Sequence, residues 1–580
     1  MAAATKRPSS EGKGAPTAKK FKSNEKGSKD AKKYDKGSKD VKKSFNKKGS
    51  GAKEPIDYKL QRKMNRPHYE IVKRAKEIWN IIREREVAKD ERTKLCDELY
   101  HLVEGKIYEV AAKHDASRVI QSLLKFGTPK QRSGTVKELQ PYILELSKMQ
   151  YGYFLVQKML KYGSLEDRAL IVKEMTGQIV KLATHNVAAN ILEAAHEFLQ
   201  PRQLSNFRLE FYGKEYALFK GELEAKGTKK NLAAIIEQSP SKKEEILAHV
   251  ADILNKMIDK QLLGLSFVQS LMLEYLNAAS SDQVNALVPN VRDAAVALLA
   301  TRNGAKVVAI TLALGNAKDK KRVIKTLKDK VLEATNHISG HIVIMRVMDV
   351  VDDTVLVQKS ILSELHDHWF EVAMHPNGAK VILQLLSPLN SKYLSPDEIE
   401  MLQPPMVTSE NGELVVNYKK DPAVRRAELW KGLQPRIESM CEEHVTELLR
   451  ERSGGHVLYE VLKATNNQNL IATVAKAIVS EVVEEGTEPL FSDLTAHKQL
   501  QRLIELPKSG EALLEELSDD VIFQWAQSNR GAFVLVAFLK NESFGRDAKK
   551  KLVGALKGKK LSKDVKAQAG TKLLLQKLEL

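Results

Sequence analysis

The stretch 114-HDASRVIQSLL-124 decides the fold, because one short helix here would carry two different stripes. Residues four apart share a helical face, so Ser117 and Gln121 lie together, with Arg118 beside them. A second stripe is aliphatic and suited to a core: Val119, Ile120, Leu123 and Leu124. The polar trio is therefore expected to look outward from a buried helix. A single such segment is typical of any half-exposed helix, so its meaning depends on whether it recurs.

The same frame returns along the chain. A small anchor residue is followed by two variable residues, two aliphatic residues and then a polar position. The copies are 116-ASRVIQ-121, 152-GYFLVQ-157, 188-AANILE-193, 264-GLSFVQ-269, 304-GAKVVA-309, 339-SGHIVI-344, 378-GAKVIL-383, 454-GGHVLY-459, 531-GAFVLV-536 and 570-GTKLLL-575, with a weak one at 497-HKQLQR-502. Most anchors lie 34 to 43 residues apart, and two gaps are 76 residues long. Eleven copies at this period, read as two helices per unit, predict an all-α chain built as an α-solenoid.

The chain divides into segments by composition. Residues 1–53 hold 17 Lys/Arg against 5 Asp/Glu and few apolar residues, which predicts a disordered basic tail. Helical periodicity begins near residue 54. The predicted organisation is a helical linker over 54–90, repeats 1–3 over 91–205, an irregular inter-arm segment over 206–250, and repeats 4–11 over 251–580 with a surface insertion near 388–422. Because the irregular segment interrupts the stack, we expect two arms rather than one crescent.

Charge and cysteine content limit the classes of function. The formal net charge is +19, of which +12 lies in residues 1–53, and such a balance favours polyanionic partners. The two cysteines, Cys96 and Cys441, lack the spacing of a disulfide framework or a thiolate zinc site. We find no apolar run long enough to span a membrane and no catalytic motif. We therefore expect no enzyme, no cofactor and no metal.

Four histidines stand shortly before anchor residues, and they are candidate metal ligands only at first sight. Each belongs to a different repeat, so they are not expected to converge on one ion. We expect instead a structural role at the turn between helices. The four are His114, His185, His337 and His375.

The small–x–x–aliphatic–aliphatic–Gln frame resembles the second helix of Pumilio (PUF) repeats. That resemblance implies a helix lining a concave RNA-binding face, on which Ser117 and Gln121 read a base edge while Arg118 stacks on bases. A hydroxyl and a carboxamide four residues apart can both bond one edge, and a planar guanidinium can stack. The stretch 211-FYGKEYALFK-220, the repeat count, the tail and the region from 425-RRAELWKGLQP-435 onward resemble the Puf-A, or Penguin-like, branch.

Later copies depart from the base-reading pattern at the second, third and sixth residues of the frame, called here the code positions. Lys306 and Lys380 stand where a base reader has Asn, Ser or Gln, and only the first copy keeps a full polar trio. This predicts loss of base reading and affinity from contact with the phosphate backbone. The candidate nucleic-acid-binding residues are Ser117, Arg118, Gln121, Tyr153, Phe154, Gln157, Asn190, Glu193, Lys306 and Lys380.

The Puf-A resemblance implies a protein of the nucleus and nucleolus that binds RNA and DNA with little sequence preference. It further implies a role in large-subunit ribosome biogenesis and pre-rRNA processing. The expected partners are pre-rRNA, messenger 3′ regions as a second RNA class, DNA and pre-ribosomal proteins, with no membrane and with the protein as a monomer. Two alternatives stay open: a sequence-specific messenger-binding translational repressor, and a HEAT-type scaffold that binds proteins and uses its tail only for targeting.

Overall fold

The second helix of each repeat begins within two residues of its anchor, and at most glycine anchors a backbone contact explains why the residue is small. A Cβ added at Gly152 would lie 2.5 Å from the carbonyl oxygen of Leu146, and one added at Gly378 would lie 2.6 Å from that of Val372. Both carbonyls belong to the short helix before the anchor. A larger residue would therefore push the first and second helices of the repeat apart.

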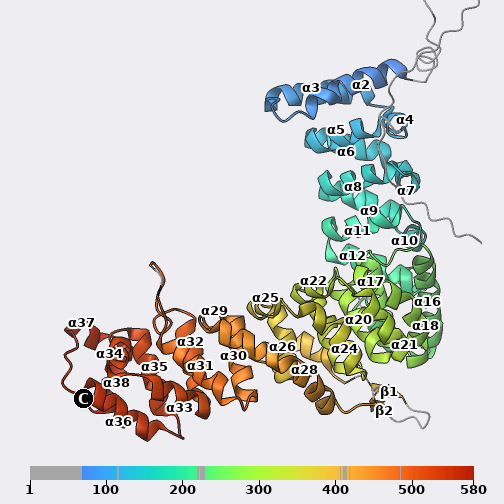
Figure 1. Ribbon diagram of the computed structural model, residues 1–580. Helices are drawn as coiled ribbons and strands as arrows, with labels where there is room; N and C mark the ends of the chain where they lie inside the picture. Colours follow the sequence, from blue (N-terminus) through green and yellow to red (C-terminus); the bar gives the residue numbers. More distant parts are fainter. Residues whose placement is uncertain are drawn as a thin grey trace, which may run out of the picture. The chain divides into compact units, whose positions relative to one another are not determined.

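The computed structural model describes residues 68–113, 116–218, 221, 229–404, 406–408, 414–416, 419–483 and 485–580. The predicted tail over 1–53, His114 and most of the stretch 220–231 lie outside these residues. Within them, repeats contain up to three helices rather than the two that the sequence predicted (Figure 1). The sequence pattern missed the first helix because it is usually too short to show a period.

The eleven second helices carry the recurring frame. They are α5 (Ser117–Phe126), α8 (Gly152–Tyr162), α11 (Ala189–Phe198), α17 (Ser266–Ala278), α20 (Arg302–Leu314), α23 (Gly340–Val350), α26 (Gly378–Leu386), α30 (Arg452–Ala464), α32 (Ala496–Glu505), α35 (Asn529–Lys540) and α38 (Ala569–Leu578). Each of them packs against the next along the whole series. The predicted all-α solenoid of eleven repeats is thus confirmed, while the bend into two arms stays a prediction.

First helices precede most of the second helices, and all but one of them are shorter than the second helix that follows. They are α4 (Ile107–Ala111), α7 (Ile143–Lys148), α10 (Ile179–Ala183), α16 (Lys243–Asp259), α19 (Ala295–Leu298), α22 (Val331–Asn336), α25 (Trp369–Met374), α29 (Val445–Arg450), α34 (Asp519–Ala526) and α37 (Lys563–Ala567). Of these, α16 is longer than the others. The described residues also contain the 3₁₀ turns η1 (Gln140–Tyr142), η2 (Pro240–Lys242) and η3 (Leu362–Leu365).

Third helices complete the repeats. They are α6 (Pro129–Leu139), α9 (Leu165–Met175), α12 (Pro201–Tyr212), α18 (Ser281–Asp293), α21 (Ala317–Thr326), α24 (Thr354–Ser360), α28 (Pro422–Glu443), α31 (Gln468–Val479), α33 (Pro507–Glu516) and α36 (Gly545–Leu556). Capping boxes begin several of them: Thr128 and Ser164 each accept a hydrogen bond from the backbone of the third helical residue, whose side chain caps the backbone in return. Such caps fix the residue at which the third helix starts.

A pair of helices precedes α4, the first helix of repeat 1: one lies in the helical linker predicted over 54–90, and the other lies almost entirely in the range predicted for repeats 1–3. Helix α2 (Tyr69–Ile82) packs on α3 (Lys89–Val103) and on α5, and the indole Nε1 of Trp79 donates to Ser122 Oγ at 2.9 Å. The described part of 54–90 thus extends the stack. Buried apolar side chains then form a continuous core from Val72 to Leu578.

Two predicted segments differ in part from the structure. The described residues of 206–250 are mostly helical, including the end of α12, α13 (Lys214–Leu218), α15 (Leu232–Gln238) and the start of α16, where an irregular segment was expected. The insertion lies between α26 and α28, where the sequence placed it. It contains α27 (Pro396–Leu402) and a small antiparallel pair of strands, β1 (Met406–Thr408) and β2 (Leu414–Val416).

Candidate nucleic-acid interface

The reading face is the surface formed by the code positions of the second helices. In repeat 1, Arg118 is exposed and Gln121 is half-buried, but Ser117 is only 1% exposed. The Nε2 atom of Gln121 donates to Ser117 Oγ at 3.2 Å. The expectation that the whole trio looks outward therefore fails for Ser117, which is buried at the start of α5, a helix that packs against α4. Arg118 and the exposed part of Gln121 remain available to a ligand.

Repeat 2 adds an aromatic ledge beside Arg118. The rings of Tyr153 and Phe154 lie 3.9 Å apart with an interplanar angle of 33°, and Phe154 is 41% exposed. Burial raises the pKa of Tyr153, so its phenol stays protonated. Arg118 and Phe154 are each the third residue of the frame in their repeat. Since α5 packs against α8, the two side chains occupy the same code position on neighbouring helices. A cation and a ring that are both open to solvent are suited to stacking on nucleobases.

The remaining candidates of repeats 2 and 3 are engaged within the protein. Gln157 Nε2 donates to the carbonyl oxygen of Asn190 at 3.1 Å. The Nδ2 atom of Asn190 donates to the carbonyl oxygen of Val187 at 3.1 Å. A carboxylate oxygen of Glu193 accepts from the backbone N–H of Phe267 at 3.3 Å. These three side chains therefore join neighbouring repeats or brace their own helix.

The sequence suggested that Lys306 and Lys380 are free to bind phosphate, but in the structure both lysines form ion pairs within the protein. The insertion lays a segment, residues 388–404, over their code positions, and we call this segment the strap. Lys306 forms an ion pair with Asp397, whose other oxygen accepts from Arg302 Nε at 2.8 Å. Lys380 Nζ lies 2.8 Å from Glu398 Oε1. Sequence reasoning missed these pairs because the carboxylates belong to a part of the chain that no periodic pattern connects to the repeats.

Glu398 is the central contact of the strap. It is 2% exposed, and His341 Nε2 lies 2.8 Å from its Oε1 atom, so one carboxylate joins repeats 6 and 7. Burial alone would raise the pKa of Glu398, but hydrogen bonds from His341, Lys380 and the backbone N–H of Ser395 hold it well below its ordinary value. The carboxylate is therefore charged at neutral pH. The capping-box sequence 395-SPDE-398 could have indicated this helix, but not where it docks.

The strap continues over repeats 8 and 9. The hydroxyl of Tyr393 donates to Glu460 at 2.7 Å and accepts from Arg502 Nη2 at 3.3 Å. Its ring lies 5.1 Å from that of His456, which occupies a code position. Burial lowers the pKa of His456 to about 4, so this imidazole is neutral at pH 7. The reading face of repeats 5 to 9 is thus occupied by the chain itself.

The histidines before the anchors act as helix caps. In repeat 6, His337 Nδ1 accepts from the backbone N–H groups of Ser339 and Gly340 at 3.2 and 3.3 Å. The same pair of bonds, with the same distances, recurs at two other histidines, His185 and His375. The predicted structural role is confirmed for these three. Among the described residues, no group of three or more His, Cys, Asp and Glu side chains could hold a metal ion.

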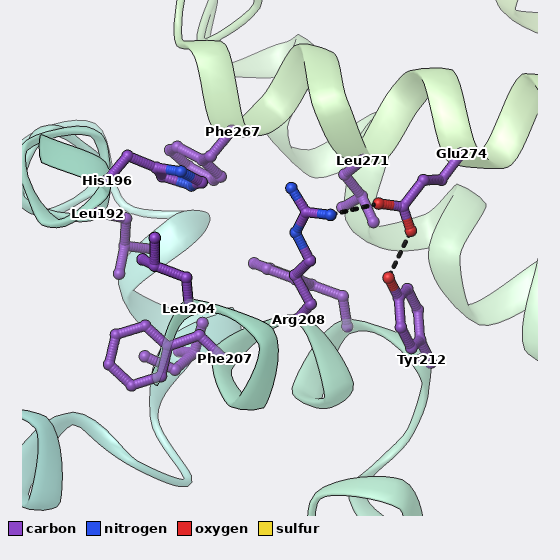
Figure 2. Close-up of a pocket in the computed structure, with 11 residues that line it drawn as sticks. Leu192, His196, Leu204, Phe207, Arg208, Tyr212, Phe267, Leu271 and Glu274 are labelled. Atoms are coloured by element: carbon purple, nitrogen blue, oxygen red, sulfur yellow. Dashed lines mark hydrogen bonds and ion pairs between the residues drawn. The ribbon is translucent and has the colours of Figure 1, made fainter. Parts of the chain in front are cut away.

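An apolar pocket lies at the junction of repeats 3 and 4, lined by residues of α10, α11, α12 and α17 (Figure 2). Figure 2 shows Arg208 and Tyr212 of α12 reaching Glu274 of α17, with Arg208 Nη1 2.9 Å from Glu274 Oε1. The open space within the pocket is about 30 Å³, room for one or two water molecules. It therefore serves the junction between repeats rather than a ligand of cofactor size. No helix in the described part of the chain is both long and apolar enough to cross a membrane.

These features define a Pumilio-repeat solenoid whose reading face is open at one end and covered further on. The family model of the Pumilio-family RNA binding repeat matches residues 107–139 and 142–176, and that of the CPL (NUC119) domain matches residues 374–509. Pumilio homolog 3 of Homo sapiens is 30% identical, with 97% of this chain and 90% of that protein covered. The chain belongs to the Pumilio family, in the branch of Puf-A, or Pumilio homolog 3.

Other relatives and solved structures agree with this assignment. Pumilio homology domain family member 6 of Schizosaccharomyces pombe is 28% identical, over 89% of this chain and 82% of that protein. The crystal structure of human Puf-A has a TM-score of 0.78 at 29% identity, covering 88% of this chain and all of that one. A second structure, of human Puf-A in complex with DNA, has a TM-score of 0.77 with the same identity and coverage.

Proposed function

We propose that the protein binds single-stranded RNA and DNA with little sequence preference, through the reading face of repeats 1 and 2. The observation that carries this proposal is the pair Arg118 and Phe154, exposed at equivalent code positions of neighbouring helices. Stacking on such groups tolerates every base, because each base has a π-face. The crystal structure of human Puf-A in complex with DNA supports a nucleic acid as the ligand.

Sequence-specific reading would need about one competent repeat per base. In repeat 4, Gln269 is fully buried and donates to the carbonyl oxygen of Leu263 at 2.8 Å. In repeats 5 to 8, code positions are buried or face the strap. We therefore favour broad binding over the sequence-specific translational repressor. Selection from random RNA would decide, since a strong consensus of several bases would support the repressor.

Binding is expected to fall when either stacking group is removed. Losing one base stack costs about 1–3 kcal/mol, so Arg118→Ala and Phe154→Ala should each weaken affinity roughly 5- to 150-fold. The loss should be similar for unrelated RNA and DNA sequences, measured by fluorescence anisotropy. Arg546→Ala and Leu165→Ala remove an exposed cation and an exposed apolar side chain elsewhere and serve as matched controls. Unchanged affinity in both test variants, with normal melting temperatures, would move the binding site to another surface.

We further propose that the protein works in the nucleolus, on pre-rRNA and with pre-ribosomal proteins during large-subunit biogenesis. The support is the charge of residues 1–53, 17 Lys/Arg against 5 Asp/Glu, together with membership of the Puf-A branch. Deleting residues 1–53 from a fluorescent fusion of the full chain should release it from nucleoli. Sequencing of RNA crosslinked to the full chain in cells should recover pre-rRNA, and recovery of messenger RNA alone would contradict the proposed role.

A further inference from the structure

The strap contacts cations that come from several repeats. Arg302 and Lys306 of repeat 5 pair with Asp397, and Lys380 of repeat 7 pairs with Glu398. Arg502 of repeat 9 reaches the Tyr393 hydroxyl. The two carboxylates are consecutive in sequence, and each one bridges two basic side chains, with His341 as the second partner of Glu398. A polynucleotide backbone makes the same pattern of contacts, because its successive phosphates pair with a row of basic side chains on the protein.

These cations lie where a Pumilio helix meets its ligand. Lys306, His341 and Lys380 all occupy the third residue of the frame, the position held by Arg118 and Phe154 in the open repeats. Without the strap, Arg302, Lys306 and Lys380 would present three uncompensated positive charges on one face. Such a surface attracts phosphates and releases their counterions.

The strap is held by a few contacts beyond its charges. Leu394 and Leu402 are each 3% exposed and anchor it to the repeats, whereas Lys392, Ser395 and Pro396 are exposed. Both ends are tied to the solenoid, through α26 and α28, so the strap is present at a high effective concentration. An external strand must therefore displace a tethered competitor before it can bind.

We propose that repeats 5 to 9 carry a second binding surface for single-stranded nucleic acid, and that the strap occupies this surface as a built-in mimic of the phosphate backbone. Asp397 and Glu398 stand in for two phosphates, and Tyr393 covers the code position of repeat 8. The inference rests on the proposed nucleic-acid binding, but it concerns a separate face from Arg118 and Phe154.

The test replaces residues 391–403 by a Gly/Ser linker of equal length in the full chain. Binding of single-stranded RNA is then measured by anisotropy over a salt series. Three new phosphate contacts should steepen the log–log salt slope by about 2, since each contributes roughly 0.7 on single strands. A milder variant, Asp397→Asn with Glu398→Gln, changes the net charge by two without removing the strap. Glu442→Gln with Glu443→Gln makes the same change in net charge at exposed positions of α28 and is its matched control.

A direct reporter covers the case in which the linker variant does not fold. Both native thiols are buried, and burial raises the pKa of Cys96 to about 11, so a cysteine introduced by Lys392→Cys can be labelled selectively. In the Asp397→Asn, Glu398→Gln variant, saturating RNA should release the strap and lower the anisotropy of a fluorophore at position 392. Unchanged anisotropy would overturn the proposal.

A folded linker variant with the affinity and salt slope of wild type would also overturn it. These results are separate from a failure of the proposed function, in which the wild-type protein binds no RNA. If the strap covers a binding surface, the linker variant should still gain affinity when it also carries Arg118→Ala. If Arg118→Ala abolishes the gain, the new affinity lies at repeats 1 and 2, and the second surface does not exist.

Discussion

Histidine side chains begin the second helices of repeats 3, 6 and 7 by accepting two backbone N–H groups at Nδ1. This geometry requires an unprotonated Nδ1 atom. At His185, burial, followed by the nearby Lys260 and Lys148, lowers the pKa below its ordinary value of 6.5. The neutral cap therefore contributes stability that is complete above about pH 6.5 and is lost as the pH falls through the lowered pKa.

Substitutions at His185 should distinguish the stability that its helix cap contributes from the pH dependence that its titration causes. His185→Ala is expected to lower the free energy of unfolding by about 1 kcal/mol at pH 8, the usual cost of a lost helix cap. His185→Asn retains an acceptor oxygen and should keep more of that stability while losing this residue's share of the pH dependence. Urea unfolding at pH 5 and pH 8 measures both effects, with His249→Asn, at an exposed position of α16, as control. Equal pH dependence in wild type and His185→Asn would show that the cap does not titrate.

At the scale of single residues, the role of a side chain could be predicted from the sequence when its bonding partner lies only a few residues away in the chain. The histidines bond backbone groups two and three residues away, so their place before each anchor was enough to predict a structural role. Lys306 and Lys380 pair with carboxylates 91 and 18 residues away, in an insertion without periodicity. Ser117 is buried at the start of α5, and a helical wheel for α5 alone does not include the packing of α5 against α4.

Arginine side chains join successive elements in the first repeats. Arg168 of α9 donates from Nε to the carbonyl oxygen of Leu160 at 2.7 Å and from Nη1 to that of Phe198 at 2.9 Å. One guanidinium thus binds carbonyl groups at the C-terminal ends of α8 and α11, where a positive charge is favoured. Arg132 of α6 repeats the arrangement with the carbonyl groups of Lys125 and Tyr162, in the last turns of α5 and α8. These residues recur at a 36-residue spacing, but the sequence pattern did not separate the third helices that hold the arginines.

Removal of this link should loosen the junction between repeats 2 and 3. Arg168→Ala is expected to lower the free energy of unfolding by about 2 kcal/mol, because hydrogen bonds to charged groups contribute roughly 1.5–3 kcal/mol. Arg168→Lys should recover only part of this, since a single ammonium cannot span both helix ends. Lys173→Ala, an exposed position of the same helix, is the control in urea unfolding. A loss no larger than that of the control would mean that the carbonyl groups find water instead.

At the scale of the whole molecule, the anchors were sufficient to predict the number and order of the repeats. At most glycine anchors, among them Gly152 and Gly378, a backbone carbonyl approaches the position where a Cβ would stand, so the same steric requirement recurs in the sequence. Helix α2 was expected as part of a helical linker but not as a helix packed on repeat 1, and the helices within 206–250 were not predicted, because these segments carry no copy of the frame. The strap was located as an insertion but not as a cover, since its docking depends on contacts with several repeats at once.

The strap also affects how parts of the solenoid unfold locally. In a repeat array, stability is a sum of local and nearest-neighbour terms, so separate regions can open independently. Here Asp397 reaches back 95 residues to Arg302, and Tyr393 reaches forward 109 residues to Arg502. Opening repeat 5 or repeat 9 alone would break contacts with a segment that the intervening repeats also hold. We therefore expect α20 and α32 to exchange their amide hydrogens in one cooperative unit, and α5 to exchange independently of them. With the strap replaced by a linker, the protection of α20 and α32 should no longer rise and fall together.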